Sequence, residues 1–418
     1  MPLRHHNLFD RVASFQALYA AAKRGIKGKR KKPGAAAFFA NLEGELLALE
    51  RQLRSGTYRP GRYIAFAVND PKKRIVSAAP FRDRVVHHAL CAVVEPIFEA
   101  GCIENTFANR VGRGTHRAIE AYEEYRDRHA YVLRCDIYRY FPTIDHAILK
   151  SDFRRRIACP STLALMDLIV DGANPQESVN VYFDGDDLFE PFRRRRGLPI
   201  GNLTSQFFAN LYLDGFDHFV TEVLKAPYVR YVDDFALFAD DPAVLRDWRA
   251  RIERYLAGRR LKVHPRKTFV ASCREPAPFL GFVLCESGHR RLPEDSVRRF
   301  RNRLRGLRDD WRTGTIDIAD VDARVRAWIA HAAHADTWRL RHAIFRGSRF
   351  DPANAPEAWT APCRRVVRGG SWSNTPDNLR SANRNRNTTD NRNNNLGFRV
   401  ARTLAAGAGA ITAAPGVR

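Results

Sequence analysis

The sequence of 418 residues predicts an α+β fold, in which helical regions flank a central part of mixed strands and helices. Residues 131–285 alternate short apolar segments, typical of strands, with a central helix and hairpins. Residues 1–60 and 290–345 instead carry apolar side chains at the spacing of a helix. The length is enough for two or three domains with a buried core.

Residues 1–60 are predicted to form a basic helical region. A charged run at 23–32 precedes Pro33 and Gly34, which favour a break between two helices. Four leucines are expected near one face of the next helix: Leu42, Leu46, Leu47 and Leu49. Short strands and one apolar helix at 85–98 are expected in residues 61–115.

The last predicted helical region, residues 290–345, contains an apolar seam with three- and four-residue spacing. Its members are Val297, Phe300, Leu304, Leu307 and Trp311. Arginines occupy the other faces: Arg298, Arg299, Arg301, Arg303, Arg305 and Arg308. Such a helix can pack along a phosphate backbone, although a charged face is also common on any solvated helix.

The charge balance favours a polyanionic partner, because 70 Lys and Arg face 46 Asp and Glu, a net charge of +24. A generally cationic protein of the ribosomal kind has the same composition. The seven cysteines are isolated, without a CxxC pair, which fits a reducing compartment and argues against a zinc knuckle. No signal-like or membrane-spanning apolar run occurs, so we expect a cytoplasmic protein without membrane contact.

Two predicted strand ends carry carboxylates suited to metal-dependent chemistry. Asp136 ends the apolar strand at 131–137, while Asp233 and Asp234 lie at the turn of an apolar hairpin at 228–238. Nucleotidyl transfer uses two divalent ions about 4 Å apart, and magnesium prefers oxygen ligands. Adjacent like charges repel, which is tolerable where a cation binds. The alternative is a surface turn that happens to contain two acids.

Residues 231–234, Tyr-Val-Asp-Asp, resemble the YxDD box of reverse transcriptases, with the Asp136 strand about a hundred residues upstream as in that family. The resemblance covers residues 10–345 and implies an RNA-directed DNA polymerase of right-hand architecture. Fingers and palm would interleave over 61–285, with a helical thumb at 286–350. Two Mg²⁺ ions, for which Mn²⁺ can substitute, would be bound by Asp136, Ile137, Asp233 and Asp234.

Further segments match family boxes in the expected order. Phe141 lies at the steric-gate position, where its ring would exclude a ribose 2′-hydroxyl. Lys73 and Arg74 resemble the fingers residues that bind the incoming triphosphate. Lys267 resembles a general acid for the pyrophosphate leaving group. Without the family boxes, Phe141 would be interpreted as an ordinary core aromatic. Lys73 and Arg74 would be interpreted as a solvated pair of charged residues.

The resemblance also implies template and primer contacts, with dNTPs, an RNA template and a DNA or RNA primer as partners. Residues 107–115 resemble the template-contacting segment of bacterial retroelement enzymes, which assigns Arg110 and Arg113 to the template. Residues 279–282 resemble the primer-grip hairpin and contain Leu280 and Gly281. Tyr231 of the YxDD box would lie beside the primer end.

Residues 197–206 indicate which reverse transcriptase this is. Most of the family has Gln-Gly followed by Ser-Pro there, whereas this sequence has Ile200-Gly201 and Ser205-Gln206. This is similar to the enzymes of diversity-generating retroelements, which work with a small basic accessory variability protein. The resemblance places Ile200 and Gly201 at the nucleotide and Ser205 and Gln206 at the template. Because isoleucine cannot hydrogen-bond there, we expect misincorporation, chiefly at template adenines.

The sequence after residue 350 changes in character, with a linker predicted at 351–363 and a disordered tail at 403–418. Residues 364–402 resemble the C-terminal end of formylglycine-generating-enzyme-like domains, which have a C-type lectin fold. Such domains are common targets of diversity-generating retroelements, and asparagine codons are adenine-rich. Seven asparagines lie there: Asn383, Asn385, Asn387, Asn391, Asn393, Asn394 and Asn395. We interpret the segment as read-through of a template repeat, with a polar low-complexity tail as the alternative.

Other interpretations remain open at this point. A retron-like, CRISPR-associated or phage-defence reverse transcriptase would share the palm boxes. A non-enzymatic RNA-binding protein with a degenerate palm is a further alternative, which the intact carboxylates disfavour. A group II intron maturase is disfavoured because no added DNA-binding or Cys-containing endonuclease region is evident. An RNA-dependent RNA polymerase is disfavoured by Phe141 and by Tyr-Val-Asp-Asp in place of Gly-Asp-Asp.

Overall fold

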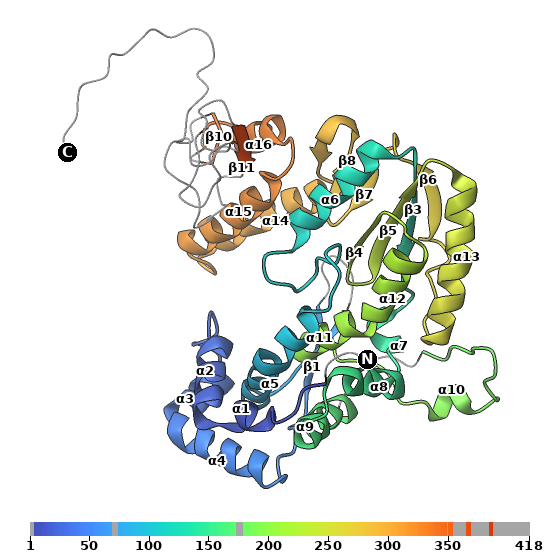
Figure 1. The fold of residues 1–418 in the computed structure, drawn as a ribbon. Helices are drawn as coiled ribbons and strands as arrows, with labels where there is room; N and C mark the ends of the chain where they lie inside the picture. Colours follow the sequence, from blue (N-terminus) through green and yellow to red (C-terminus); the bar gives the residue numbers. More distant parts are fainter. Residues whose placement is uncertain are drawn as a thin grey trace, which may run out of the picture. The chain divides into compact units, whose positions relative to one another are not determined.

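The structure is a computed structural model that describes residues 4–68, 74–172, 179–348 and 350–353, and the backbone of two strands at 365–368 and 384–387. The chain divides into two compact units, residues 1–275 and 276–418, each described here by itself (Figure 1). Helices and antiparallel sheets occur in the same chain, so the α+β prediction is confirmed.

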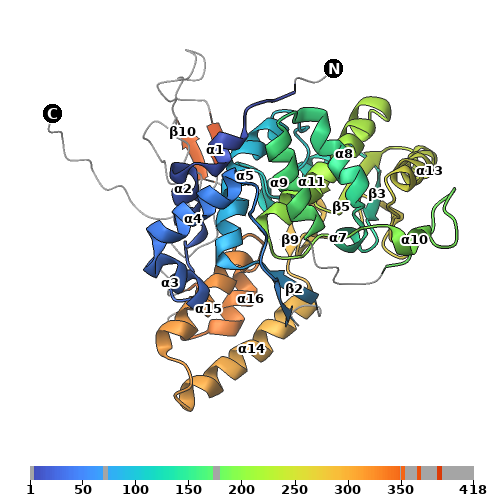
Figure 2. The ribbon, with the colours of Figure 1, turned by 90° about the horizontal axis from the view of Figure 1, so that it is seen from below.

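The N-terminal helices of the first unit pack around one long helix, α5 (Phe81–Glu99) (Figure 2). They are α1 (Phe9–Ala13), α2 (Phe15–Gly25), α3 (Pro33–Ala40) and α4 (Leu42–Arg54). Leu46 and Leu49 of α4 are buried, but Leu47 is exposed, so its assignment to the apolar face was wrong. The physical reason is that each residue advances about 100° around a helix, which turns Leu47 away from Leu46.

A two-stranded hairpin precedes α5. Its strands, β1 (Ile64–Val68) and β2 (Arg74–Ala78), pair antiparallel, with Val68 opposite Arg74. Every residue of β1 is exposed, so this hairpin offers a surface rather than a core. Residues 69–73, and with them Lys73, lie outside the described part of the chain.

A four-stranded antiparallel sheet forms the centre of the first unit. Its strands are β3 (Tyr131–Asp136), β4 (Tyr228–Tyr231), β5 (Asp234–Ala239) and β6 (Phe269–Ser272). They lie in the order β4-β5-β3-β6. The sheet therefore places the predicted hairpin directly beside the predicted Asp136 strand.

Aromatic side chains attach helices to this sheet. Phe238 of β5 meets Tyr122 of α6 (Thr115–Arg128) edge to face, with ring centroids 5.0 Å apart. Phe235 meets Phe216 of α12 (Asp214–His218) in the same way at 5.2 Å. Because side chains alternate along a strand, these two helices pack on opposite faces of β5. The helix α13 (Pro242–Gly258) also packs on β3, β5 and β6.

Shorter helices connect the sheet to the N-terminal helices. Their bounds are α7 (Tyr140–Thr143), α8 (His146–Arg156), α9 (Pro160–Asp171), α10 (Glu190–Arg193), α11 (Leu203–Tyr212) and the π-helix η1 (Phe219–Val223). The Asp145 carboxylate caps α8 by accepting hydrogen bonds from the Ala147 and Ile148 amides. The helix α11 ends at Tyr212, and α12 begins two residues later at Asp214.

The second unit joins a small sheet to three helices. The sheet contains β7 (Ala277–Phe279), β8 (Phe282–Leu284) and β9 (Arg290–Arg291), with a short 3₁₀ turn, η2 (Glu286–Gly288). The helices are α14 (Glu294–Arg312), α15 (Ile318–Ala332) and α16 (Trp338–Phe345). Phe300 of α14 stacks on Trp328 of α15 with ring centroids 3.8 Å apart. Trp311 is half exposed, so it lies outside the core that the seam predicted.

Two further strands, β10 (Arg365–Arg368) and β11 (Arg384–Asn387), pair antiparallel within the C-terminal segment. The predicted tail at 403–418 and most of the predicted linker lie outside the described residues. Among the helices that are described, none combines the length and apolar character needed to cross a membrane.

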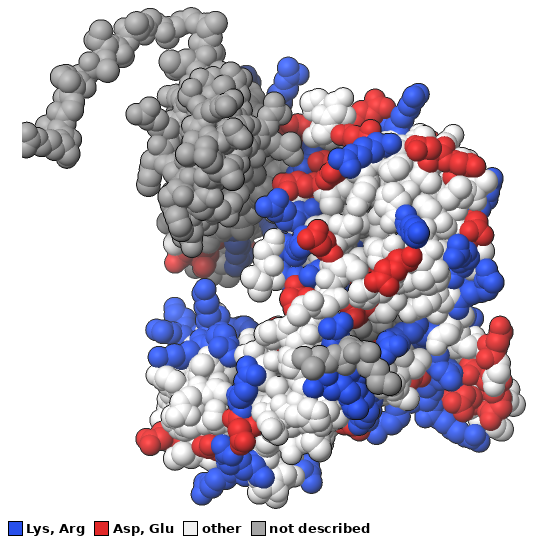
Figure 3. Space-filling model, viewed as in Figure 1, with Lys and Arg blue, Asp and Glu red and all other residues white. Residues whose placement is uncertain are grey.

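Basic side chains are spread over much of the visible described surface (Figure 3). In the first unit, one concentration is the exposed loop that joins α2 to α3. Its cations are Lys27, Lys29, Arg30, Lys31 and Lys32. A loop with this charge attracts a polyanion such as nucleic acid.

Candidate active site

The β4–β5 hairpin presents the predicted catalytic acids. Tyr231 pairs with Asp234 at its end, so Val232 and Asp233 form the turn. Val232 has a φ of 58°, in the left-handed region that a β-branched residue rarely adopts. The Ile137 amide donates a hydrogen bond of 3.1 Å to the Asp233 carbonyl. This bond ties the turn to the end of β3.

Asp136 and Asp234 are cross-strand neighbours in the register of β3 and β5. Directly opposed residues project to the same face of a sheet, so the two carboxylates lie together. Burial, and after it the charges of Asp233 and Asp136, raise the pKa of Asp234 to about 7. Burial and the Asp136 charge also raise the pKa of Asp233, against the opposing effects of Lys267 and Arg74. The site thus gathers three carboxylates in a partly buried place.

Lys267, the predicted general acid, contacts this acidic group. Its ammonium nitrogen lies 2.6 Å from Asp136 Oδ2, while the side chain remains 48% exposed. The residue follows a turn in which the Lys267 amide donates to the His264 carbonyl, and the His264 amide donates to the Asp136 carbonyl. Lys267 is therefore positioned at the carboxylates and remains accessible to a leaving group.

The carboxylates match the chemistry of divalent ions, although their present arrangement is not a metal cage. Across the described ranges, no three His, Cys, Asp or Glu side chains are gathered closely enough to hold an ion. Partly buried acids with raised pKa values are nevertheless what a cation would stabilise, and carboxylate oxygen is the ligand that magnesium prefers. Asp136, Asp233 and Asp234 would hold the ions, with Lys267 shifting from Asp136 Oδ2. The apolar Ile137 could contribute only its backbone.

Phe141 lies on α7, one turn beyond the end of β3. Its ring is half buried and meets Tyr140 edge to face at 5.8 Å. Its carbonyl accepts a 2.9 Å hydrogen bond from the Leu198 amide. The backbone of the predicted steric gate is thereby fixed to the segment that contains Ile200.

Residues 200–202 attach this segment to β2. The Ser77 amide donates to the Ile200 carbonyl at 2.9 Å. The buried Asn202 side chain accepts from the Ala79 amide at 3.1 Å and donates to the Ser77 carbonyl at 2.8 Å. The exposed Arg74 begins the same strand. Two predicted nucleotide-binding positions, Ile200 and Arg74, are therefore joined through β2.

Gly201 is required by its geometry. Its φ is +110°, and a Cβ at this position would lie 2.6 Å from Val76 Cγ1. We expect Gly201→Ala to lower the free energy of unfolding by about 1–3 kcal/mol and to raise the KM for dNTPs. The matched control is Gly258→Ala in α13, where a Cβ meets nothing within 4 Å. Equal thermal stabilities and equal KM values for the two variants would contradict this assignment.

The predicted template contacts differ in accessibility. Gln206 is exposed, but Ser205 is buried in α11, so it can reach a template only through a rearrangement. The Arg110 side chain is 8% exposed and pairs with Glu99 at 2.6 Å. It also donates to the carbonyls of Ile103 and Thr106. Arg110 therefore organises the loop in this structure, which is a different role from the predicted phosphate contact.

Other parts of the same loop remain accessible. Arg113 is half buried, with its guanidinium 6.0 Å from the Phe107 ring. Val111, at the loop tip, is fully exposed. The Thr115 hydroxyl donates to the Tyr231 hydroxyl at 3.2 Å, which connects the loop to the β4–β5 hairpin.

Leu280 and Gly281, the residues of the predicted primer-grip hairpin, lie in the second unit. They form the β7–β8 turn, and both have a positive φ.

Sequence reasoning missed two buried polar positions that organise the site, Asn202 and Arg230. Arg230 had a signal, because a charged residue inside the apolar 228–238 hairpin needs a partner when buried. Asn202 had no such signal in the sequence, because its hydrogen bonds with Ala79 and Ser77 join residues more than 120 positions apart.

Comparison with known proteins identifies the family. The family model described as reverse transcriptase (RNA-dependent DNA polymerase) matches residues 69–284, just over half of the chain. The chain belongs to the reverse transcriptase family. This reverse transcriptase is accordingly an RNA-directed DNA polymerase, a nucleotidyltransferase whose relatives use divalent metal ions and bind an RNA template and primer. The right-hand polymerase architecture comes with that family.

Two further similarities were found for the reverse transcriptase. Protein YkfC of Escherichia coli (strain K12) is 24% identical over 323 residues, which cover 64% of this chain and 80% of that protein. A structure of telomerase from Candida albicans, in complex with the TWJ fragment of telomeric RNA, matches with 13% identity and a TM-score of 0.35. That match covers 56% of this chain and 46% of the telomerase chain.

The C-terminal region resembles a second family. A model for the sulfatase-modifying factor enzyme 1-like domain matches residues 311–404. The resemblance expected for residues 364–402 is confirmed, and the match begins earlier, at the end of α14.

Proposed function

We propose that this reverse transcriptase serves a diversity-generating retroelement and copies its RNA template with frequent errors at adenines. The observation that carries the proposal is the combination of two features in one chain. A reverse transcriptase domain has Ile200-Gly201 in place of Gln-Gly, and a segment similar to the sulfatase-modifying factor family follows it. Each feature has an ordinary explanation alone, whereas the proposal accounts for both.

The polymerisation step assigns roles to the described residues. Bound divalent ions would activate the primer 3′-hydroxyl and neutralise the triphosphate. Asp136 and Asp234, opposed across β3 and β5, and Asp233 at the turn provide the carboxylate oxygens. Lys267 supplies a proton to the pyrophosphate as it leaves. Arg74, with Lys73, binds the triphosphate.

The position of Ile200 supports reduced selectivity. Its carbonyl is fixed to Ser77, and its side chain is half buried. An aliphatic side chain in such a fixed place can exclude a base pair of the wrong shape, but it cannot form a hydrogen bond to a base or sugar. A pocket without polar checks separates similar substrates by only about 1–3 kcal/mol. An incorrect pair would therefore be rejected less strongly than by an enzyme with glutamine there.

The codons of the asparagine-rich segment, residues 364–402, support the same function. Its asparagine codons place adenines in the RNA at many positions, and the whole segment lies within the match to a domain family at 311–404. A reading frame that enters the template repeat would produce such a segment. The DNA around the gene tests this proposal. It should contain a second copy of the 364–402 coding sequence that differs almost only at adenines, and a second copy that differs equally at all four bases would overturn it.

We expect Ile200→Gln to lower misincorporation opposite template adenine by about tenfold, which corresponds to about 1.4 kcal/mol. Glutamine would restore a hydrogen-bonding side chain at the nucleotide. The measurement is sequencing of cDNA made by both proteins on one RNA template. Ile200→Leu is the matched control, because it keeps an aliphatic side chain and should keep the error rate.

We also expect a protein truncated after Ala353 to retain polymerase activity when the complete template RNA is supplied separately. The cut is placed there because Asp351 is buried and accepts hydrogen bonds from His342 and the Gly347 amide. Primer extension by the full-length and truncated proteins should agree within about twofold. A collapse of activity would show that the C-terminal segment works as protein.

A further inference from the structure

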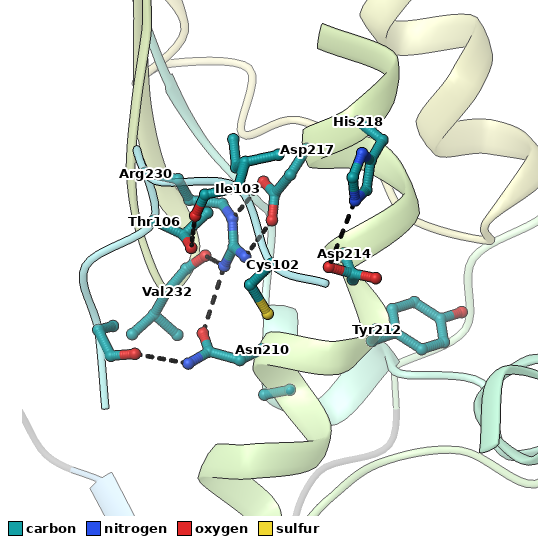
Figure 4. A network of polar contacts seen from close by, with 12 residues as sticks. Cys102, Ile103, Thr106, Asn210, Tyr212, Asp214, Asp217, His218, Arg230 and Val232 are labelled. Atoms are coloured by element: carbon teal, nitrogen blue, oxygen red, sulfur yellow. Dashed lines mark hydrogen bonds and ion pairs between the residues drawn. The ribbon is translucent and has the colours of Figure 1, made fainter. Parts of the chain in front are cut away.

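A buried ion pair lies behind the catalytic turn (Figure 4). Arg230 of β4 donates from Nε to Asp217 Oδ1 at 2.7 Å and from Nη2 to Asp217 Oδ2 at 2.5 Å. The two side chains are 2% and 3% exposed. Tyr228 donates a further hydrogen bond of 2.8 Å to Asp217 Oδ1. The pair is two-pronged, so the orientation of the guanidinium plane is fixed.

The remaining terminal nitrogen of Arg230 reaches the turn itself. Nη1 donates to the Val232 carbonyl at 2.9 Å and also to Asn210 Oδ1 at 3.3 Å. One guanidinium therefore connects α12, α11 and the β4–β5 turn (Figure 4). The carbonyl that it fixes belongs to the residue immediately before Asp233.

Val232, the residue immediately before Asp233, has a strained backbone. Val232 has a φ of 58°, and left-handed backbone is strained for a β-branched residue. Such a conformation persists only where its surroundings enforce it. The hydrogen bond from Arg230 to the Val232 carbonyl is an enforcing contact, and Asp217 provides the anchor behind it.

Arg230 also joins the turn to the loop at 103–115. The Arg230 amide donates to the Asn105 carbonyl at 3.0 Å, and the Phe107 amide donates to the Arg230 carbonyl at 3.0 Å. The Asn210 amide group donates to the Ala108 carbonyl at 2.6 Å. The loop, the turn and α11 are thus connected through Arg230 and its neighbours.

We propose that Arg230, anchored by Asp217, is a positioning residue that keeps Val232 left-handed and thereby aims Asp233 and Asp234. In this role it acts through the backbone of the turn, by its hydrogen bond to the Val232 carbonyl. The proposal is independent of any role in a retroelement, because it concerns the geometry of the carboxylates in any reaction that they support.

The competing explanation is that the pair only stabilises the fold. The chain offers a comparison in Arg259 and Asp152, which also form a two-pronged pair, with Arg259 donating to the Tyr212 carbonyl. This pair contacts no residue of the turn. Asp152→Asn is therefore the control for loss of a largely buried ion pair without loss of turn geometry.

The experiment compares Asp217→Asn and Arg230→Lys with that control, well below their unfolding temperatures. Arg230→Lys preserves the buried charge balance, so the protein should fold, but an ammonium cannot bridge Asp217 and Val232 as the guanidinium does. We expect kcat to fall by at least about tenfold in both variants, with the KM for dNTPs and template affinity within about twofold. Asp152→Asn should lower stability but leave kcat unchanged.

A rescue separates positioning from general stability. Glycine adopts positive φ without strain, so Val232→Gly removes the need to enforce the turn. In that background, Asp217→Asn and Arg230→Lys should each cost less than about threefold in kcat. Full-sized losses in the Val232→Gly background, or losses in Asp152→Asn equal to those in Asp217→Asn, would overturn the proposal.

Discussion

Replacing Asp233 with alanine is expected to lower the rate of primer extension on an RNA template by at least about 1000-fold. Asp233 lies at the turn beside Asp234, which in turn opposes Asp136 across two strands. Removing one of three carboxylates leaves charge in the transition state unbalanced, because the bound ions would lose a ligand that no neighbouring group replaces. The measurement is primer extension with Mg²⁺, performed under single-turnover conditions.

The control for that variant is Asp240→Asn. Asp240 follows the same strand, β5, and its carboxylate accepts from the Ala130 amide at 3.0 Å, away from the turn. An asparagine there retains an acceptor, so activity should be unchanged. Activity of Asp233→Ala within about threefold of wild type would refute the assignment of this hairpin as the catalytic centre.

The second large effect is expected at Phe141. We predict that Phe141→Ala will lower selectivity for dNTPs over rNTPs by about 10–100-fold, because the ring that blocks the 2′-hydroxyl is removed. The bond from the Leu198 amide to the Phe141 carbonyl fixes only the backbone, so it should survive in the variant. The measured quantity is the ratio of kcat/KM for dNTP and rNTP incorporation.

Loss of packing has to be separated from loss of the gate. Phe219→Ala is a suitable control, because Phe219 is also half buried and stacks on Tyr255 with ring centroids 4.5 Å apart. It should lower stability without altering the choice of sugar. An unchanged selectivity in Phe141→Ala would mean that this ring belongs only to the core.

Local patterns in the sequence were sufficient to predict the strands and the turn that contains Asp233. The apolar runs at 131–137 and 228–238 correspond to β3 and to β4 with β5. Their proximity followed from the family resemblance, whereas the register that opposes Asp136 to Asp234 is visible only in the structure. Leu47 was misplaced because it follows Leu46 directly and so lies about 100° further around the helix. Trp311 keeps the helical spacing of the seam, but spacing does not show what covers a side chain.

The long-range polar contacts could not be predicted. Arg110 was expected at the template because residues 107–115 resemble a template-contacting segment, yet in this structure it pairs with Glu99 and two carbonyls. Asn202 connects segments that are far apart in the chain, and Arg230 has its partner on a helix, α12. Periodicity contains no information about such partners, because they depend on how the elements pack.

The most direct test of the account is the error spectrum of the wild-type enzyme on one RNA template with equal numbers of the four bases. The cDNA should be sequenced with any accessory protein present, and errors should be scored by template base. We predict that misincorporation opposite adenine exceeds that opposite each other base by at least about tenfold. Equal error rates at all four bases would contradict it, while leaving the reverse transcriptase itself in place.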